Sequence, residues 1–201
     1  MENILEDSSI ISTLFYTAVA LISIVMYHKS NSDYSSRSKK IHSISSFMYI
    51  YKYIQVSTFF VCMASIWSNH EYLFKLYANN DLFTYTGIAI SGLAITLFAM
   101  SRFSLGKNYS PCYDSYMPKN LKTTGAYSLV RHPIYSSNIL LMVGIFVSTG
   151  SLVIAANTVI LFIYYILSAF IEEKAIVKKF PKYKSYKNRT GMFIPNFSRM
   201  I

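Results

Sequence analysis

The sequence predicts an all-α membrane protein, a polytopic bundle of about five transmembrane helices with its functional site in the C-terminal half. Hydrophobic residues make up 53% of the 201-residue chain and charged residues only 14%, whereas soluble domains are usually about one quarter charged. Four long runs carry no charge apart from Lys52, and most of the 19 lysines and arginines lie between those runs. This composition excludes a disordered chain and disfavours an ordinary soluble domain.

Each uncharged run is about as long as a membrane crossing, or longer. The first three occupy residues 9–27, 44–67 and 82–100, and the fourth occupies residues 134–171. Because roughly 20 helical residues cross a bilayer, we interpret the fourth run as a helical hairpin that turns near residues 148–151. Buried helices of a soluble protein are the alternative for any single run, but four such runs in one short chain disfavour it.

The basic residues predict the orientation in the membrane. Residues 28–43, residues 101–133 and the tail after residue 171 hold 17 of the 19 basic residues, and five crossings place these segments on one side. Since cytoplasmic loops are enriched in Lys and Arg, this side is predicted to be cytoplasmic and the N-terminus outside. The acidic N-terminus argues against a cleaved secretory signal, so the first run is expected to remain as a span. A bacterial inner membrane and the endoplasmic reticulum fit equally well.

The net charge of +10 follows from these loops, because basic residues beside an anionic leaflet are attracted to it. No nucleic-acid partner is therefore expected. The two cysteines, Cys62 and Cys112, have no metal-like spacing, so neither a disulfide framework nor a metal site is expected.

Polar side chains concentrate in two places that the hairpin would bring to one membrane face. One is the loop of residues 121–135, which enters the hairpin, and the other is the pair Glu172-Glu173, which ends it, together with residues 180–186 that follow. Taken singly, Arg131 is also typical of an orientation anchor, and Pro133 of the first turn of a helix. An acid pair in a segment rich in lysine is harder to explain structurally. The sequence therefore predicts one shared cavity.

The ordered set of motifs resembles one family. Gly125-x-Tyr-x-x-x-Arg131-His-Pro-x-Tyr135, the uncharged hairpin, Glu172-Glu173 and a terminal Ile-Pro resemble the integral-membrane family of isoprenylcysteine carboxyl methyltransferases and phospholipid methyltransferases. The resemblance covers about residues 101–195. It implies a catalytic half at residues 101–201 preceded by three helices at residues 1–100, with S-adenosyl-L-methionine as the cofactor. Consistently, the chain has no Gly-x-Gly-x-x-Gly loop typical of a Rossmann domain.

The resemblance also implies which positions contact the cofactor, whose ammonium, carboxylate and sulfonium suit acidic, basic and aromatic groups respectively. Direct methyl displacement depends mainly on alignment. A carboxylate acceptor would need no general base whereas an amine would, so no catalytic residue is assigned. The candidate cofactor-binding residues are Lys119, Asn120, Leu121, Lys122, Tyr127, Arg131, His132, Pro133, Ile134, Tyr135, Glu172 and Glu173.

One departure from the family concerns the substrate. Prenylcysteine methyltransferases of this family carry an Arg at the position of Ser168, which puts a prenylcysteine acceptor in doubt. Lys52 is a candidate replacement, because charges inside spans are often functional, although it also fits a snorkelling anchor. Ser168 and Lys52 are therefore the candidate substrate-binding residues. The predicted partners are the lipid bilayer and a lipophilic or amphipathic acceptor, such as a prenylated or lipid molecule with a carboxylate or an amine.

Two other functions stay open. NADPH-dependent sterol-type reductases share a related His-Pro-x-Tyr segment, but the acid pair favours methyl transfer. A non-catalytic scaffold or carrier does not require an acid pair beside an Arg-His-Pro cluster, and the sequence shows no internal repeat of the kind common in carriers.

Overall fold

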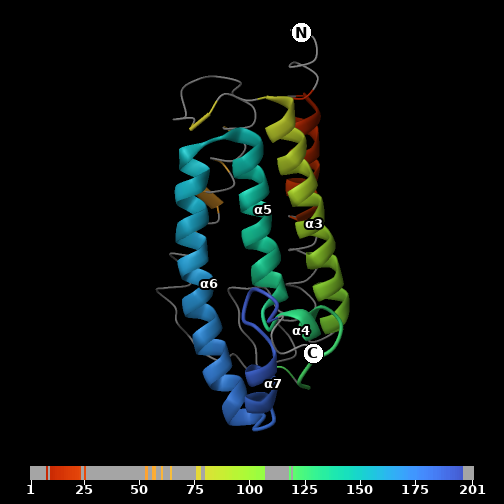
Figure 1. The fold of residues 1–201 in the computed structure, drawn as a ribbon, viewed down its shortest axis with the longest axis vertical. Helices are drawn as coiled ribbons and strands as arrows, with labels where there is room; N and C mark the ends of the chain where they lie inside the picture. Colours follow the sequence, from red (N-terminus) through yellow and green to blue (C-terminus); the bar gives the residue numbers. More distant parts are fainter. Residues whose placement is uncertain are drawn as a thin grey trace.

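The computed structural model describes residues 10–23, 80–106 and 120–196, together with single positions at 8, 25, 53, 56, 57, 60, 64, 76, 77 and 118. The described part is helical, and the predicted all-α class is confirmed. Figure 1 shows α5 between α3 and α6, with α4 and α7 near one end of the bundle. After an N-terminal helix, Ile10–Ser23, the helices are α3 (Asp81–Leu105), α4 (Ala126–Leu129), α5 (Pro133–Thr149), α6 (Leu152–Lys179) and α7 (Tyr183–Arg189).

Helices α5 and α6 form the hairpin expected for the longest uncharged run. Gly150 caps α5 with a φ of 65°, a left-handed conformation that glycine adopts without strain, and its N–H donates to Phe146 O at 2.7 Å. Ser151 caps α6, because its hydroxyl accepts from Ile154 N. The start of α5 and the end of α6 therefore return to the same end of the molecule (Figure 1).

Among the described helices, α3 and α6 are long and apolar enough to cross a bilayer, and Ile10–Ser23 and α5 are shorter apolar helices. The 28 residues of α6 rise about 42 Å, more than the roughly 30 Å hydrocarbon core. We therefore take residues 152–171 as its membrane-spanning segment, with the acid pair beyond it. The predicted span at residues 44–67, including Lys52, falls largely outside the described residues. Five crossings and their orientation stay predictions.

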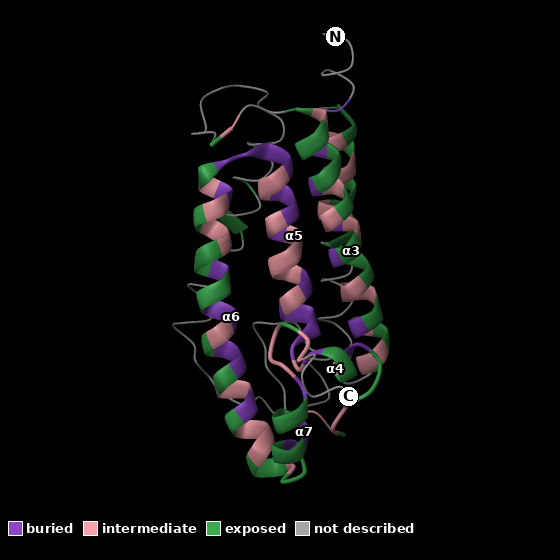
Figure 2. Ribbon diagram, in the orientation of Figure 1, coloured by how far each residue is buried: buried purple, intermediate pink, exposed green. Residues whose placement is uncertain are grey.

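The outer faces of the bundle carry large apolar side chains. Phe103 is 84% exposed, Leu93 67% and Phe170 55%. In Figure 2, exposed and half-buried residues cover the outer faces of α3 and α6, whereas buried residues follow one stripe of α5. Soluble monomers rarely expose extended apolar surfaces of this kind. The pattern supports a helical bundle surrounded by lipid.

The interface between α3 and α5 is built from small residues. A Cβ atom at Gly87 would lie 2.4 Å from Gly144 O, and one at Gly144 would lie 2.2 Å from Ser91 Oγ. The Tyr16 hydroxyl of the N-terminal helix lies 2.8 Å from Ser148 Oγ and 3.2 Å from Ser91 Oγ. Close helix approach at small residues, with hydroxyl groups bonding across it, is typical of membrane bundles. This interface fixes the position of α5.

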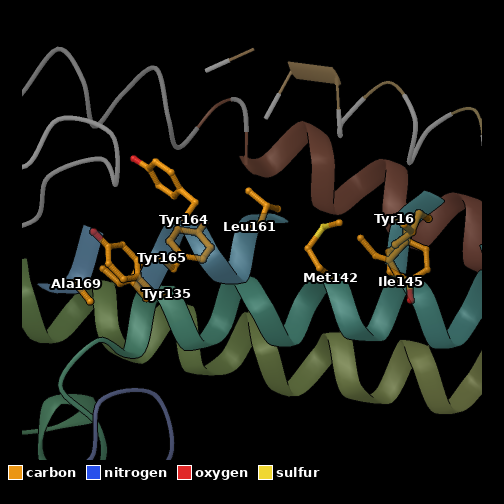
Figure 3. Close-up of a cluster of buried hydrophobic side chains, with 10 residues drawn as sticks. Tyr16, Tyr135, Met142, Ile145, Leu161, Tyr164, Tyr165 and Ala169 are labelled. Atoms are coloured by element: carbon orange, nitrogen blue, oxygen red, sulfur yellow. The ribbon is translucent and has the colours of Figure 1, made fainter. Parts of the chain in front are cut away.

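A buried apolar cluster joins the N-terminal helix, α5 and α6 (Figure 3). Its tyrosines Tyr135, Tyr164 and Tyr165 gather toward the end where α5 begins, and Tyr165 accepts a hydrogen bond from Asn138 Nδ2 at 3.0 Å. The core thus becomes more polar as it approaches the acid pair. Its buried members are Tyr16, Ile134, Tyr135, Met142, Ile145, Ile154, Leu161, Tyr164, Tyr165 and Ala169.

Candidate functional site

The entry to α5 is shaped by one glycine and one proline. Gly125 has a φ of 68°, and a Cβ atom there would lie 2.4 Å from Ser104 Oγ, so the turn before α4 favours glycine. Pro133 occupies the first turn of α5, where its missing N–H leaves no bond unmade, and His132 precedes it as the N-cap residue. His132 and Tyr135 therefore both stand at the first turn of α5.

The C-terminal tail runs alongside this entry segment. Arg131 N donates to Gly191 O at 2.8 Å, and His132 N donates to Met192 O at 3.0 Å. Val130 and Gly191 form an isolated parallel bridge. The backbone of residues 130–132 is thus held by the tail, which forms one wall of the candidate site.

Two further features hold the tail in this path. Ser136 Oγ donates to Phe193 O at 2.8 Å, which ties the tail to the first turn of α5. A Cβ atom at Gly191 would lie only 1.9 Å from Ile194 O, so the turn at this position requires glycine. The tail follows a fixed course over the start of α5.

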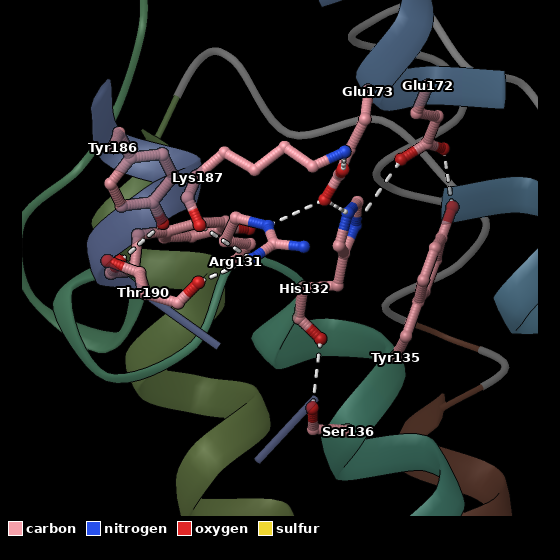
Figure 4. A network of polar contacts seen from close by, with 10 residues as sticks. Arg131, His132, Tyr135, Ser136, Glu172, Glu173, Tyr186, Lys187 and Thr190 are labelled. Carbon is pink, nitrogen blue, oxygen red and sulfur yellow. Dashed lines mark hydrogen bonds and ion pairs between the residues drawn. The ribbon is translucent and has the colours of Figure 1, made fainter. Parts of the chain in front are cut away.

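Glu173 is the centre of a buried charge network (Figure 4). Its Oε1 accepts from Arg131 Nε at 2.6 Å and lies 3.2 Å from His132 Nε2, while its Oε2 lies 2.7 Å from Lys187 Nζ. The side chains of Glu173 and Arg131 are only 2% and 8% exposed. Arg131 Nη1 also donates to the backbone oxygens of Lys187 and Thr190. The start of α5, the end of α6 and α7 therefore meet at one carboxylate.

This network sets the ionisation of Glu173. Burial acts to raise the pKa of Glu173, but the hydrogen bonds from His132, Lys187 and Arg131 outweigh it and lower the pKa from 4.5 to about 2. Glu173 is therefore ionised at neutral pH. Removing one member of the buried Arg131–Glu173 pair is strongly destabilising, because the charge left behind is uncompensated.

Glu172 lies in a different environment from its neighbour. Its side chain is 19% exposed, its Oε1 accepts from the Tyr135 hydroxyl, and its Oε2 lies 3.7 Å from His132 Nδ1. The His132 ring therefore stands between the two acids (Figure 4). The Tyr135 ring stacks on His132 with centroids 5.3 Å apart, and Tyr165 stacks on Tyr135 at 4.6 Å. The Glu172 carboxylate therefore lies beside a stack of three aromatic rings.

The structure brings together some of the other predicted residues. Ser168 is buried on α6, one turn before Glu172, and Ile134 is buried in the apolar core. Tyr127 is half-buried, and its backbone oxygen accepts from the Tyr186 hydroxyl of α7. Ser168 and Ile134 are thus near Glu172 and His132 in the chain, and Tyr127 contacts α7.

The segment before α4 is described from Asn120 onward. Asn120 is exposed, and Leu121 and Lys122 are half-buried. Lys179 Nζ at the end of α6 donates to Pro118 O at 2.8 Å, which brings this segment to the same end of the bundle. Lys119, like Lys52, lies outside the described residues.

The sequence placed residues 180–186 beside the predicted cavity, but no residue of α7 was among the candidate site residues, and Lys187 was missed altogether. Tyr183, Tyr186 and Lys187 are spaced i, i+3 and i+4, which places them on one helical face, and this spacing is the signal that could have identified them. Both tyrosines are buried, which raises the pKa of each hydroxyl, and the Glu173 carboxylate raises it further. Both are therefore neutral at physiological pH.

A cavity of about 520 Å³ lies beside the network. Phe193 lines this cavity, and the centroids of its ring and the His132 ring are 6.0 Å apart. Among the described residues that line it, Ser136 carries the one hydroxyl, which bonds to the backbone oxygens of His132 and Phe193, so this part of the lining presents an apolar surface. It is lined by Leu97, Ser136, Ile139, Leu140, Val143, Phe162, Met192, Phe193 and Ile194.

Comparison with known proteins identifies the family. The family model described as phospholipid methyltransferase matches residues 82–183, which include the entry segment of α5 and both acids. The described residues contain no group of three or more His, Cys, Asp or Glu that could hold a metal ion.

Two curated relatives are named for metal resistance. The chain is 33% identical over 116 residues to the cobalt-zinc-cadmium resistance protein CzcN of Cupriavidus metallidurans. It is 30% identical over 115 residues to the nickel-cobalt-cadmium resistance protein NccN of Alcaligenes xylosoxydans xylosoxydans. Each match covers 56% of this chain and 54% of the relative, so the chain spans about half the length of the curated relatives it matches. The family model matches half of the chain, and this protein belongs to the phospholipid methyltransferase family, as the sequence resemblance predicted.

Proposed function

We propose that this protein is an integral-membrane methyltransferase that transfers a methyl group from S-adenosyl-L-methionine to a lipophilic or amphipathic acceptor. The observation that carries the proposal is the convergence of the Arg131-His132 segment and the acid pair at one end of the α5–α6 hairpin (Figure 4). The proposed catalytic half is residues 101–201, with its cofactor pocket on the basic side of the membrane, which we propose to be cytoplasmic. The membership of this chain in the phospholipid methyltransferase family supports this activity.

The side chains at this end fit the proposed cofactor. Glu172 is ionisable, partly exposed and beside a tyrosine hydroxyl, which suits an ammonium group or ribose hydroxyls. The faces of His132 and Tyr135 offer aromatic surface to a sulfonium, an attraction of about 0.5–2 kcal/mol. Arg131 is occupied by Glu173, so the first turn of α5 is the better partner for the cofactor carboxylate.

The two acids would then have different roles. Glu173 is enclosed by Arg131, His132 and Lys187, so it holds the site together from inside. Glu172 is the more accessible acid and would contact the ligand directly. When bound, the cofactor supplies an electrophilic methyl group, and the chain contributes alignment and exclusion of water.

The apolar cavity supports a lipophilic acceptor. It borders Phe193 of the tail and reaches along α5 to Val143, so an acceptor chain lying in it would extend from the site into the bilayer. Ser168 and Lys52 stay candidates for contact with the polar group of the acceptor. Resistance to metals, the property for which the two relatives are named, is a cellular outcome and is compatible with a methyltransferase activity.

Binding of S-adenosylhomocysteine to the purified protein in detergent tests the proposal. Calorimetry should show saturable binding, and Glu172→Gln and His132→Asn should each weaken it about tenfold or more, as expected for the loss of a charge-assisted hydrogen bond. Asp81→Asn, in the first turn of α3, removes a carboxylate elsewhere and should leave the Kd unchanged.

Three outcomes would contradict parts of this proposal. Unchanged affinity in both site variants would remove the site assignment. Stabilisation by NADPH but not by S-adenosylhomocysteine would favour the sterol-type reductase, because a ligand stabilises the folded state it binds. Failure to bind either would favour a scaffold or a carrier. Methyl transfer from labelled cofactor into extracted lipids, with His132→Asn as the control, would identify the acceptor.

A further inference from the structure

Lys187 contributes two separate groups to the charge network. Its ammonium lies 2.7 Å from Glu173 Oε2, and its backbone oxygen accepts from Arg131 Nη1 at 3.2 Å. Arg131 Nε in turn donates to Glu173 Oε1 at 2.6 Å. The three residues therefore form a closed ring in which each contacts the other two (Figure 4).

This ring fixes the orientation of the Glu173 carboxylate. A carboxylate held at one oxygen can rotate about its side-chain bonds, whereas a hydrogen bond from Arg131 at one oxygen and an ion pair with Lys187 at the other restrict that rotation. With Oε2 held by Lys187, Oε1 faces Arg131 and His132. Because Oε1 engages His132 Nε2, the opposite ring nitrogen, Nδ1, faces Glu172.

We propose that Lys187 is a positioning residue of the site: from the tail, it locks Glu173 and thereby holds His132 and Glu172 in the arrangement that binds the methyl donor. This inference rests on the function proposed above. Lys187 acts through Glu173 and does not itself contact the ligand. Helix α7, which carries it, is thus part of the binding machinery.

The position of Lys187 separates this role from a purely structural one. Its side chain is 42% exposed whereas that of Arg131 is 8% exposed, so solvent screens its ion pair with Glu173 more and the pair contributes less to folding stability than the Arg131–Glu173 pair. A small displacement in a binding site, in contrast, can lower its efficiency about a hundredfold. Loss of the ammonium should therefore affect the site more than the fold.

The test compares Lys187→Met with Lys187→Arg and with Lys184→Met, which removes an exposed lysine of the same helix. Two quantities are measured, the Kd for S-adenosylhomocysteine and the ¹⁵N NMR signals of the His132 ring, assigned with His132→Asn. Lys187→Met should weaken binding about tenfold and shift the His132 signals, with an unfolding temperature close to that of Lys184→Met. Lys187→Arg should keep the wild-type Kd and His132 signals, because it keeps a cation at this position.

Equal Kd values and equal His132 signals in Lys187→Met and Lys184→Met would overturn the inference. If the wild type does not bind S-adenosylhomocysteine, the proposed function fails, and the His132 signals still decide about Lys187. A change in the His132 signals that occurs in Lys187→Met and not in Lys184→Met would then support the positioning role of Lys187 without a ligand. Lys187→Gln, with a polar side chain, provides the same comparison if Lys187→Met does not fold.

Discussion

The two ends of α5 are held by different kinds of interaction. Toward its C-terminal end, Gly144 and Ser148 pack against Gly87 and Ser91 of α3, where the backbones approach closely and hydroxyl groups bond across the interface. At its N-terminal end, α5 is held by the charges around Glu173 and by the tail. We call these two regions the small-residue interface and the charge network.

The difference follows from the surroundings of each region. In hydrocarbon an isolated charge is expensive, so helix packing there depends on shape and on short hydroxyl contacts. Beyond the hydrocarbon, a carboxylate can stay ionised and be oriented by cations from several segments. The bundle is therefore assembled by one chemistry, and the candidate site at its end is built by another.

Removal of the Glu173 carboxylate is expected to have the largest effect. Glu173→Ala leaves Arg131 buried without its anion, and breaking a buried ion pair typically costs about 3–5 kcal/mol. The free energy of unfolding by sodium dodecyl sulfate in mixed micelles measures this loss. Glu173→Gln, which keeps the size and one acceptor, should lose less. A loss below about 1 kcal/mol for Glu173→Ala would mean that the network is no more stabilising than a surface ion pair.

The stabilisation that the Glu173 carboxylate provides is expected to depend on pH. Because the pKa of Glu173 is lowered from 4.5 to about 2 in the folded protein, its ionised form stabilises the fold above pH 4.5, and this contribution is lost as the pH falls toward 2. The difference in unfolding free energy between the wild type and Glu173→Gln should therefore be constant above about pH 5 and shrink below it.

The charge network could be predicted from the sequence only in part. An uncharged run of residues 134–171 is twice the length of one crossing, so its two ends had to return to one side, and Arg131 met the acid pair for that reason. Which acid is buried could not be predicted, because adjacent residues of a helix point about 100° apart and either could face inward.

The tail and the small-residue interface were harder to foresee. The bonds from Arg131 N and His132 N to the tail join backbone groups and leave no signature in the side chains. Gly87 and Ser91 have the small-xxx-small spacing of packed membrane helices, as do Gly144 and Ser148. The sequence does not state which helices such pairs join, since that depends on how the whole bundle assembles.

Gly144→Ala should have an intermediate effect and test whether shape holds the small-residue interface. The added Cβ would lie 2.2 Å from Ser91 Oγ and 2.8 Å from Gly87 O, and overpacking of this kind costs about 1–3 kcal/mol. Gly92→Ala, in the facing helix α3, is the control, because a Cβ there meets nothing within 4 Å. It should be neutral or slightly stabilising. Equal unfolding free energies for the two variants would refute close packing at Gly144.

Tyr16→Phe should have the smallest effect and asks whether hydroxyl bonds or close backbone approach dominate this interface. The change removes the hydroxyl 2.8 Å from Ser148 Oγ, and hydrogen bonds between membrane helices contribute about 0.6 kcal/mol on average. Ser148 keeps Thr84 O as an acceptor at 3.0 Å, so its hydroxyl is not left without a bond. Unfolding in mixed micelles should thus show a loss well below that of Gly144→Ala. A loss that equals or exceeds it would mean that polar bonds hold both ends of α5, and the two regions would differ in charge alone.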